Sequence, residues 1–339
     1  MSLNRLSTLF LPSVENQLCD IIDKAAGENG RAQEMRTMLR YHLGLDDPSA
    51  DASQRGKRIR PLILLLVTSA AGGDWKTGLP AAASVELIHN FSLIHDDIQD
   101  HSQLRRGRPT VWVKWGESQA INAGDAMFTL AQDVLLDLQD HVPAEVVLRA
   151  SRVLQRACLA LTQGQFLDLS YESRNDLDVE DYWPMVNGKT AALLSACTEI
   201  GALISETEIE ICRAYRRFGR NLGLAFQALD DLLGIWGDAA LTGKSTESDL
   251  LTGKKSLPVL YAIGENGAFA RRWVQGPISV DEVAQLADQL KAEGAHEFTQ
   301  ACALDLTERS LTALEAAKPT GEAGVALRQL AEKLLSRHA

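Results

Sequence analysis

The sequence is poor in cysteine and in aromatic residues. Its 339 residues include five cysteines, and Phe, Trp and Tyr together make up 6%. The cysteines are scattered and odd in number, and no Cys-x-x-Cys pair occurs, which argues against a disulfide framework or a zinc site. Free thiols are typical of a reducing cytosol, so we expect a cytoplasmic protein.

Long hydrophobic runs are also absent. The amino-terminal segment MSLNRLSTLF lacks the apolar stretch of a signal peptide. The most hydrophobic stretch, residues 61–71, is too short to cross a bilayer. We therefore expect no integral membrane segment, and we interpret residues 61–71 as part of a buried helix.

Positive charge is in deficit. The chain has 34 Lys and Arg against 45 Asp and Glu, which gives a formal net charge of −11. A general nucleic-acid binder would show a basic surplus, so we expect no nucleic-acid partner. The same balance argues at first against anionic substrates, although total charge describes solubility and steering rather than an individual site.

Period-two strand patterns bounded by Asn-Gly or Asp-Gly turns are absent as well. Ala and Leu are frequent throughout, which favours an all-α protein. We predict a polar, mobile loop over 237–256 and one domain over 1–339. The predicted helices cover residues 15–44 with a break near 27–30, then 60–71, 79–100, 117–139, 143–170, 179–204, 207–236 and 280–339 with breaks near 294 and 319–321.

Three aspartates, Asp96, Asp97 and Asp100, close the helix predicted over 79–100. Asp96 and Asp100 are four residues apart and share one helix face, where like charges repel. Acidic residues at a helix C-terminus also oppose the helix dipole. Both penalties favour a bound cation over a merely solvated acidic end. Mg²⁺ suits such a site because it prefers a few carboxylates together with water and phosphate oxygens.

A second acidic cluster follows far downstream. Asp230 and Asp231 end another mostly apolar helical stretch, and Gly234 stands where a third carboxylate would match the first cluster. Two such clusters indicate facing helices that hold metal ions between them.

Basic residues supply the complementary charge. Arg offers phosphate a planar fork, and Lys offers a movable point charge. Each basic run alone would be read as a solvated surface patch. Gathered around metal-binding carboxylates, they favour receptors for more than one diphosphate. They are Lys57, Arg58, Arg60, Arg105, Arg106, Lys189, Lys244, Lys254 and Lys255.

The chain resembles the trans-polyprenyl diphosphate synthases of the isoprenoid synthase superfamily. The likeness runs from about residue 56 to residue 258, with the motifs in family order. Each motif alone would be a weak signal, but a chance match to all of them is very improbable. The motifs are GKRIRP, ELIHNFSLIHDDIQD, RRG-x-PT, AGDAM, GKTA, FQALDD, GDAALTGK and GKKSLP.

The resemblance implies a single-domain bundle of long helices around a central cavity, the isoprenoid synthase type I fold. It implies a homodimeric prenyltransferase that joins isopentenyl diphosphate to an allylic diphosphate. Two or three Mg²⁺ ions would neutralise the leaving pyrophosphate as the allylic C–O bond ionises. Isopentenyl diphosphate then attacks the cation through its double bond, and loss of a proton gives a product one C5 unit longer.

Roles for individual residues follow from the matched motifs. Isopentenyl diphosphate would bind Lys57, Arg60, His89 and Arg106. The allylic diphosphate would bind Arg105, Lys189, Thr190, Gln227, Lys244 and Lys254, with Lys254 a better match than Lys255. The metal ligands would be Asp96, Asp97, Asp100, Asp230 and Asp231. Catalysis would depend on Asp96, Asp97, Asp100, Asp230, Lys189 and Lys244.

Chain length is expected to depend on Phe91 and Ser92, which precede Asp96 by five and four residues. A large ring at Phe91 would limit elongation, and the small Ser92 leaves more room than a second aromatic residue. Bacterial makers of C15 products carry two extra residues inside the first aspartate cluster, and this chain has none. We therefore expect a C20 product, with C15 as the close alternative; Phe91 could also be merely a core residue.

Other interpretations remain open at this stage. A class I terpene cyclase shares the fold but needs no second diphosphate receptor. A non-catalytic subunit of a heteromeric synthase should lack the first aspartate cluster, and only Gly234 supports that alternative. His95 beside Asp96 could mimic the metal pair of a phosphohydrolase, with His42 or His101 as partners. Nothing in the context of those two supports it, so we interpret His95 as structural.

Overall fold

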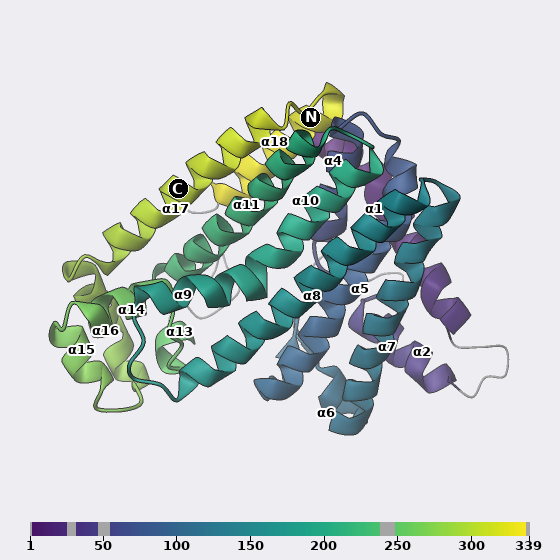
Figure 1. The fold of residues 1–339 in the computed structure, drawn as a ribbon. Helices are drawn as coiled ribbons and strands as arrows, with labels where there is room; N and C mark the ends of the chain where they lie inside the picture. The colour runs from purple at the N-terminus through teal and green to yellow at the C-terminus, as the bar shows by residue number, and fades with distance from the viewer. Residues whose placement is uncertain (1, 26–31, 47–54, 238–247, 337–339) are drawn as a thin grey trace. The chain divides into compact units, whose positions relative to one another are not determined.

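The structure is a computed structural model, and it describes residues 2–25, 32–46, 55–237 and 248–336. Helices make up nearly all of the regular structure in these ranges (Figure 1). The strands described are β1 (Leu104–Arg105) and β2 (Arg108–Pro109), which pair antiparallel as one hairpin. The all-α prediction is confirmed. Within the described part of the chain, no helix combines the length and apolar character needed to span a bilayer.

The chain divides into two compact units. Unit 1 comprises Met1–Gln155, Cys197–Cys212 and Lys318–Leu327, and unit 2 comprises Arg156–Ala196, Arg213–Ala317 and Arg328–Ala339. Both units are assembled from segments that are discontinuous in the sequence. The single domain expected over residues 1–339 stays a prediction.

Unit 1 is built around α5 (Leu79–Gln99), which packs against α1, α4 and α7. Its own helices are α1 (Ser2–Ala25), α2 (Gln33–His42), α4 (Ile59–Ala70), α6 (Val111–Trp115) and α7 (Glu117–Leu136), with the 3-10 turns η1 (Trp75–Gly78) and η2 (Asp137–Asp140). Figure 1 shows α5 and α7 side by side. Four helices contribute residues to both units: α8 (Ala144–Glu172), α10 (Ala192–Ile204), α11 (Ile209–Trp236) and α18 (Gly321–Leu335).

Helix α5 is buried along most of its length. Residues 80–88 are buried without interruption, so the helix is apolar nearly all round, as an interior helix must be. Pro80 lies in the first turn, where its missing N–H would have no partner in any case. The Ser84 hydroxyl donates to the Ala131 carbonyl of α7 at 2.7 Å. These contacts fix the direction of α5 and the position of its acidic C-terminal end.

Unit 2 is organised by α11 and by α14 (Leu257–Gly264). It also contains α9 (Val179–Val186), the π-helical turn η3 (Asn187–Ala191), α13 (Ser248–Leu251), α15 (Ala268–Trp273), α16 (Val280–Ala292) and α17 (Ala295–Ala316). Leu257 and Leu260 pack in one hydrophobic cluster with Leu229 of α11. Val259 packs in a second cluster with Phe269. Helix α14 is therefore buried on opposite faces.

Most predicted helices are present, with shifted ends. The helix predicted from residue 15 begins at Ser2, because Leu6 and Phe10 continue its buried face. The helix predicted over 179–204 is interrupted by the π turn. The predicted loop over 237–256 contains α13, and its residues 238–247 lie outside the described residues.

Candidate active site

The first aspartate motif lies at the C-terminal end of α5, in unit 1. Asp100 caps the helix, and its N–H donates to the Asp96 carbonyl at 2.8 Å. Asp96 is half-buried and Asp100 is exposed, whereas Asp97 is only 1% exposed. The motif therefore offers one buried carboxylate and two accessible ones at a helix end that already carries partial negative charge.

The buried carboxylate of Asp97 pairs with Arg105 of strand β1. The Arg105 Nε donates to Asp97 Oδ1 at 2.6 Å, whereas the buried Oδ2 has no hydrogen-bond partner. Burial raises the pKa of Asp97 to about 6, although the charge and hydrogen bond of Arg105 act in the opposite direction. A buried acceptor with spare capacity is a favourable place for a cation.

The β1–β2 hairpin presents its two arginines through a tight turn. Arg106 and Gly107 both have positive φ, 54° and 73°, as a type I′ hairpin turn requires. The Arg106 guanidinium lies over Gly56, where an added Cβ would approach its Cζ to 2.7 Å. Arg106 also donates to the Arg55 carbonyl at 3.0 Å. Because Gly56 of the GKRIRP motif has no side chain, it leaves room for the guanidinium of Arg106 from the RRG motif.

Arg60 contacts His89, and the charge of Arg106 also acts on that ring. The Arg60 Nη1 lies 3.1 Å from His89 Nε2. Because a guanidinium can only donate, Nε2 must be the acceptor and the ring proton lies on Nδ1. Burial and the charges of Arg60, Arg106 and Arg105 hold the pKa of His89 well below its ordinary value. His89 is therefore neutral, and the positive charge here comes from the arginines.

A buried ion pair supports this arrangement. Arg58 donates to Glu86 Oε1 at 2.7 Å, and Asn90 donates to the same oxygen at 2.9 Å. The side chains of Arg58 and Glu86 are 2% and 3% exposed. Arg58 of the GKRIRP motif is thus a supporting residue, and the exposed Lys57 stands beside it. We call Lys57, Arg60, His89 and Arg106 the basic cluster.

In unit 2, the π turn positions Lys189 and Thr190. A Cβ at Gly188 would lie 2.5 Å from the Ala160 carbonyl oxygen, and one at Gly164 would lie 2.2 Å from the Lys189 nitrogen. The two glycines therefore allow α8 and the turn to meet backbone to backbone. Lys189 forms an ion pair with Asp168 of α8. Single π turns inserted in helices are frequent at functional sites.

Asp231 organises the second aspartate motif. Its Oδ1 accepts a hydrogen bond from Gln227 at 3.0 Å, and its Oδ2 accepts from the Tyr182 hydroxyl at 2.8 Å and from the Leu257 N–H at 2.9 Å. Gln227 in turn accepts from Thr190 at 2.9 Å. Burial raises the pKa of Asp231. Both carboxylate oxygens of Asp231 therefore already accept hydrogen bonds from the protein. The side chain of the neighbouring Asp230 is half-buried.

Lys254 lies between two carboxylates. Its Nζ is 3.9 Å from Asp231 Oδ1 and 3.7 Å from Asp249 Oδ1. Burial acts to lower the pKa of Lys254, but Asp231 and Asp249 together raise it. Lys255 instead donates to the Tyr171 and Glu172 carbonyls. Lys244 lies outside the described residues.

Sequence reasoning missed Asp168, Asp249 and Tyr182. Asp168 follows Gln165 by three residues, a spacing that places both side chains on one face of α8 and could have revealed Asp168 from the sequence. Asp249 precedes Lys254 by five residues, and that spacing gives no such indication. We call the acidic and lysine side chains of this region the aspartate–lysine cluster. Its members are Asp168, Lys189, Asp230, Asp231, Asp249 and Lys254.

The aspartates are the candidate ligands for Mg²⁺. Among the residues that the structure describes, no group of three or more His, Cys, Asp and Glu side chains is arranged to hold a metal ion. Mg²⁺ usually binds one or two carboxylates and completes its shell with waters and substrate phosphates. The unpartnered Oδ2 of Asp97 and the accessible Asp96 and Asp100 match that donor chemistry. The residues therefore fit Mg²⁺ with substrate oxygens as further ligands.

The residues expected to control chain length lie on α5. The Phe91 ring packs against Phe128 of α7, with centroids 5.2 Å apart, and against His95 at 4.9 Å. Ser92 is buried and donates to the His89 carbonyl. The Nε2 of His95 lies 3.7 Å from Oδ1 of Asp125, so His95 contacts α7. Within the described ranges, neither His42 nor His101 joins it in a metal-binding group.

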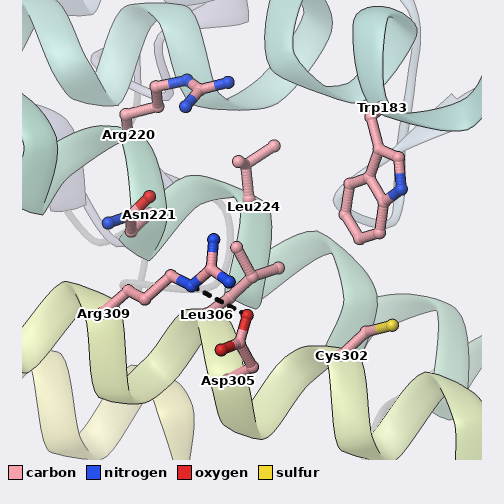
Figure 2. A pocket seen from close by; sticks show the side chains of 8 residues that line it. All are labelled: Trp183, Arg220, Asn221, Leu224, Cys302, Asp305, Leu306 and Arg309. Carbon is pink, nitrogen blue, oxygen red and sulfur yellow. Dashed lines mark ion pairs between the residues drawn. The ribbon is translucent and has the colours of Figure 1, made fainter. Parts of the chain in front are cut away.

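A further cavity of about 240 Å³ lies in unit 2. Figure 2 shows Trp183 on one side, Arg220 and Asn221 on the other, and Leu224 and Leu306 between them. Arg309 pairs with Asp305 at 2.9 Å along its edge. None of the predicted site residues lines this cavity.

Comparisons with known proteins point to one family. The Polyprenyl synthetase family profile matches residues 45–290. The chain is 42% identical to the (2E,6E)-farnesyl diphosphate synthase of Mycobacterium tuberculosis over 278 residues, which cover 79% of this chain and 76% of the relative. It is 39% identical to the geranylgeranyl diphosphate synthase of the same organism over 326 residues, covering 91% and 92%.

Solved structures give the same result. The fold matches polyprenyl synthetase from Streptomyces coelicolor with a TM-score of 0.85 and 36% identity, covering 98% of both chains. It matches geranylgeranyl pyrophosphate synthetase from Pyrococcus horikoshii with a TM-score of 0.88 and 31% identity, covering 99% of this chain and 98% of the other. The chain belongs to the polyprenyl synthetase family and is a prenyltransferase.

Proposed function

We propose that this chain condenses isopentenyl diphosphate head to tail with an allylic diphosphate to give a short-chain all-trans prenyl diphosphate. C20 is the favoured product and C15 the next. The similarity to both farnesyl and geranylgeranyl diphosphate synthases supports a short product. The observation that carries the proposal is the basic cluster, in which Arg60 contacts the neutral His89 and the charges of Arg60 and Arg106 act on its ring, because such a group of cations suits a second diphosphate.

In this account, the basic cluster binds isopentenyl diphosphate. Arg60 and Arg106 keep their charge, and the acceptor Nε2 of His89 holds Arg60 in place. The buried Arg58–Glu86 pair fixes the loop that carries Lys57. Arginine forks suit phosphate oxygens because they donate two parallel hydrogen bonds. The nucleophile is the double bond of the substrate, so this receptor needs no general base.

The aspartate–lysine cluster and Arg105 bind the allylic diphosphate. Lys189 and Lys254 present ammonium groups that carboxylates hold in place, and Asp231 fixes Gln227. Lys244 is proposed to join them. When bound, two or three Mg²⁺ ions held by Asp96, Asp97, Asp100 and Asp230 would neutralise the departing pyrophosphate. Asp231, counted among the metal ligands from the sequence, serves here mainly to orient its neighbours.

The proposed condensation breaks one C–O bond and forms one C–C bond. The allylic C–O bond breaks and pyrophosphate leaves with the electron pair. The π electrons of isopentenyl diphosphate form the new C–C bond at the allylic carbon. The cation formed loses a proton to a pyrophosphate oxygen, which leaves a new double bond. The residues named above bind the two substrates, orient them and supply part of the positive charge that an ionisation of this kind needs.

The protein is proposed to be a cytoplasmic homodimer. The exposed Ile121, Phe128 and Leu136 lie along one stripe of α7 and support an apolar contact there. Light scattering coupled to size-exclusion chromatography would measure the mass in solution. A monomer at micromolar concentration would contradict the homodimer.

Two other functions fit the site less well. A terpene cyclase would use one diphosphate, and the basic cluster argues against it. A non-catalytic subunit would lack the first aspartate motif, and here Asp96, Asp97 and Asp100 are all present. The test is product analysis with C5, C10 and C15 allylic primers, isopentenyl diphosphate and Mg²⁺. We expect C20 to accumulate with C15 next, and no elongation of any primer would overturn the proposal.

A further inference from the structure

Gly234 of α11 lies directly beneath the carboxylate of Asp249. A Cβ added at Gly234 would lie 2.2 Å from Asp249 Oδ2, 2.7 Å from its Cγ and 3.2 Å from Oδ1. No Cβ can approach other atoms so closely, so any side chain at position 234 would displace Asp249. The carboxylate of Asp249 thus occupies the space that the Cβ of any other residue at position 234 would need.

Glycine at this position needs an explanation, because it weakens a helix interior relative to alanine. Helix α11 continues past Gly234 to Trp236, so the residue does not end the helix. Its φ is not in the left-handed region, so backbone strain does not require glycine either. The requirement that remains is room for Asp249.

Asp249 in turn holds a lysine of the candidate site. It is 8% exposed and lies in α13, and its Oδ1 is 3.7 Å from Lys254 Nζ. The same ammonium is 3.9 Å from Asp231 Oδ1. Two carboxylates from different elements therefore define the position of one cation. A flexible four-carbon side chain is fixed much better by two partners than by one.

We propose that Asp249 replaces the missing third carboxylate of the second aspartate motif, and that it positions the Lys254 ammonium for the allylic diphosphate. Gly234 is the residue that makes this replacement possible. Asp249 acts through Lys254, so it is a positioning residue. The inference rests on the proposed function, because it assumes that Lys254 binds that substrate.

The first experiment measures stability and needs no activity. Gly234→Ala should destabilise the protein in denaturant unfolding, because its Cβ displaces the Asp249 carboxylate. In the Asp249→Gly background the same change should become neutral or stabilising, since the obstacle is gone and alanine favours the helix. Gly264→Ala is the matched control, because a Cβ there meets nothing within 4 Å. An equal effect of Gly234→Ala in both backgrounds would overturn the close approach.

The second experiment measures the positioning role. Asp249→Asn keeps the shape and removes the charge, and it should raise the KM for the allylic diphosphate about tenfold. The KM for isopentenyl diphosphate should change less than twofold. The exposed Asp288→Asn is the control. Exchanging the carboxylate, Gly234→Asp with Asp249→Gly, should restore most of the loss.

The outcomes separate the inference from the function on which it rests. An active wild type with an unchanged allylic KM in Asp249→Asn would overturn the inference alone. A wild type that does not elongate any primer would overturn the proposed function, while the stability experiment would still report on Gly234 and Asp249. Equal losses for both substrates in Asp249→Asn would indicate a general structural role and would also overturn positioning.

Discussion

The Arg105 Nε lies 2.6 Å from Asp97 Oδ1 and thereby ties the hairpin to the first aspartate motif. The Asp97 side chain is 2% exposed and that of Arg105 is 31% exposed. The pair therefore holds a buried carboxylate whose ionised form would otherwise be costly. It also brings Arg106, on the same turn, toward Gly56 and the GKRIRP motif.

Removing Arg105 should destabilise the folded state. Arg105→Ala leaves the Asp97 carboxylate buried without its counter-charge, and we expect a loss of about 2 kcal/mol in the free energy of unfolding. Urea unfolding measures it. The control is Arg174→Ala, which breaks the exposed pair with Asp176 and should cost much less. Equal small losses would show that the Arg105–Asp97 pair adds nothing.

Two histidines that the fold holds neutral should make the protein less stable as the pH falls. Burial and neighbouring arginines hold the pKa values of His42 and His89 well below the ordinary value. The unfolded chain takes up protons below about pH 6.5, whereas the folded chain does not. The contribution of each histidine to the free energy of unfolding should therefore decrease from about pH 7 toward pH 5, by up to about 1.4 kcal/mol per pH unit, whereas Asp97, whose pKa burial raises to about 6, acts in the opposite direction.

The substitution His89→Gln tests that slope, because glutamine does not titrate. Unfolding curves of the wild type and the variant should converge as the pH falls. A wild type whose stability does not change more steeply than that of the variant would mean that His89 is protonated in the folded state.

Asp96 and Mg²⁺ should be needed together for turnover. Asp96→Ala should lower kcat/KM at least about a hundredfold, because ionisation loses a group that stabilises the leaving charge. Removing Mg²⁺ with a chelator should abolish turnover, and adding it back should restore it. Asp133→Ala on the exposed surface of α7 is the control. Undiminished turnover of Asp96→Ala would refute the metal assignment.

Phe91 should limit the length of the product. Its ring packs against Phe128, and truncation to alanine would open space along α5 beyond the aspartates. Phe91→Ala should therefore shift the products toward longer chains, measured by chromatography of the dephosphorylated alcohols. Leu148→Ala, an exposed residue of α8, should leave the distribution unchanged. An unaltered distribution in Phe91→Ala would mean that Phe91 is only a core residue.

The sequence alone was sufficient to predict those helices that depend on a pattern of neighbouring residues. Helix α5 was predictable because residues 80–88 are mostly apolar and the aspartates mark its end. The π turn around Lys189 was not, since it depends on the close approach of Gly164 to Gly188 across two helices. The two-residue strands of the hairpin are likewise too short to show a period.

Some residues of the candidate site could be predicted from the sequence, and others could not. Asp96, Asp97, Asp230 and the basic motifs were recognised from their order in the chain. Asp249 was not, because its position over Gly234 is a tertiary relationship between α11 and α13. The sequence showed Gly234 only as a missing carboxylate, and the structure shows that the Asp249 carboxylate lies where a Cβ at this position would stand.

The most direct measurement supplies farnesyl diphosphate and Mg²⁺ with or without labelled isopentenyl diphosphate. We expect one label incorporated for each pyrophosphate released, with geranylgeranyl diphosphate formed only when both substrates are present. Release of pyrophosphate together with a hydrocarbon in the absence of isopentenyl diphosphate would contradict the account and identify a cyclase.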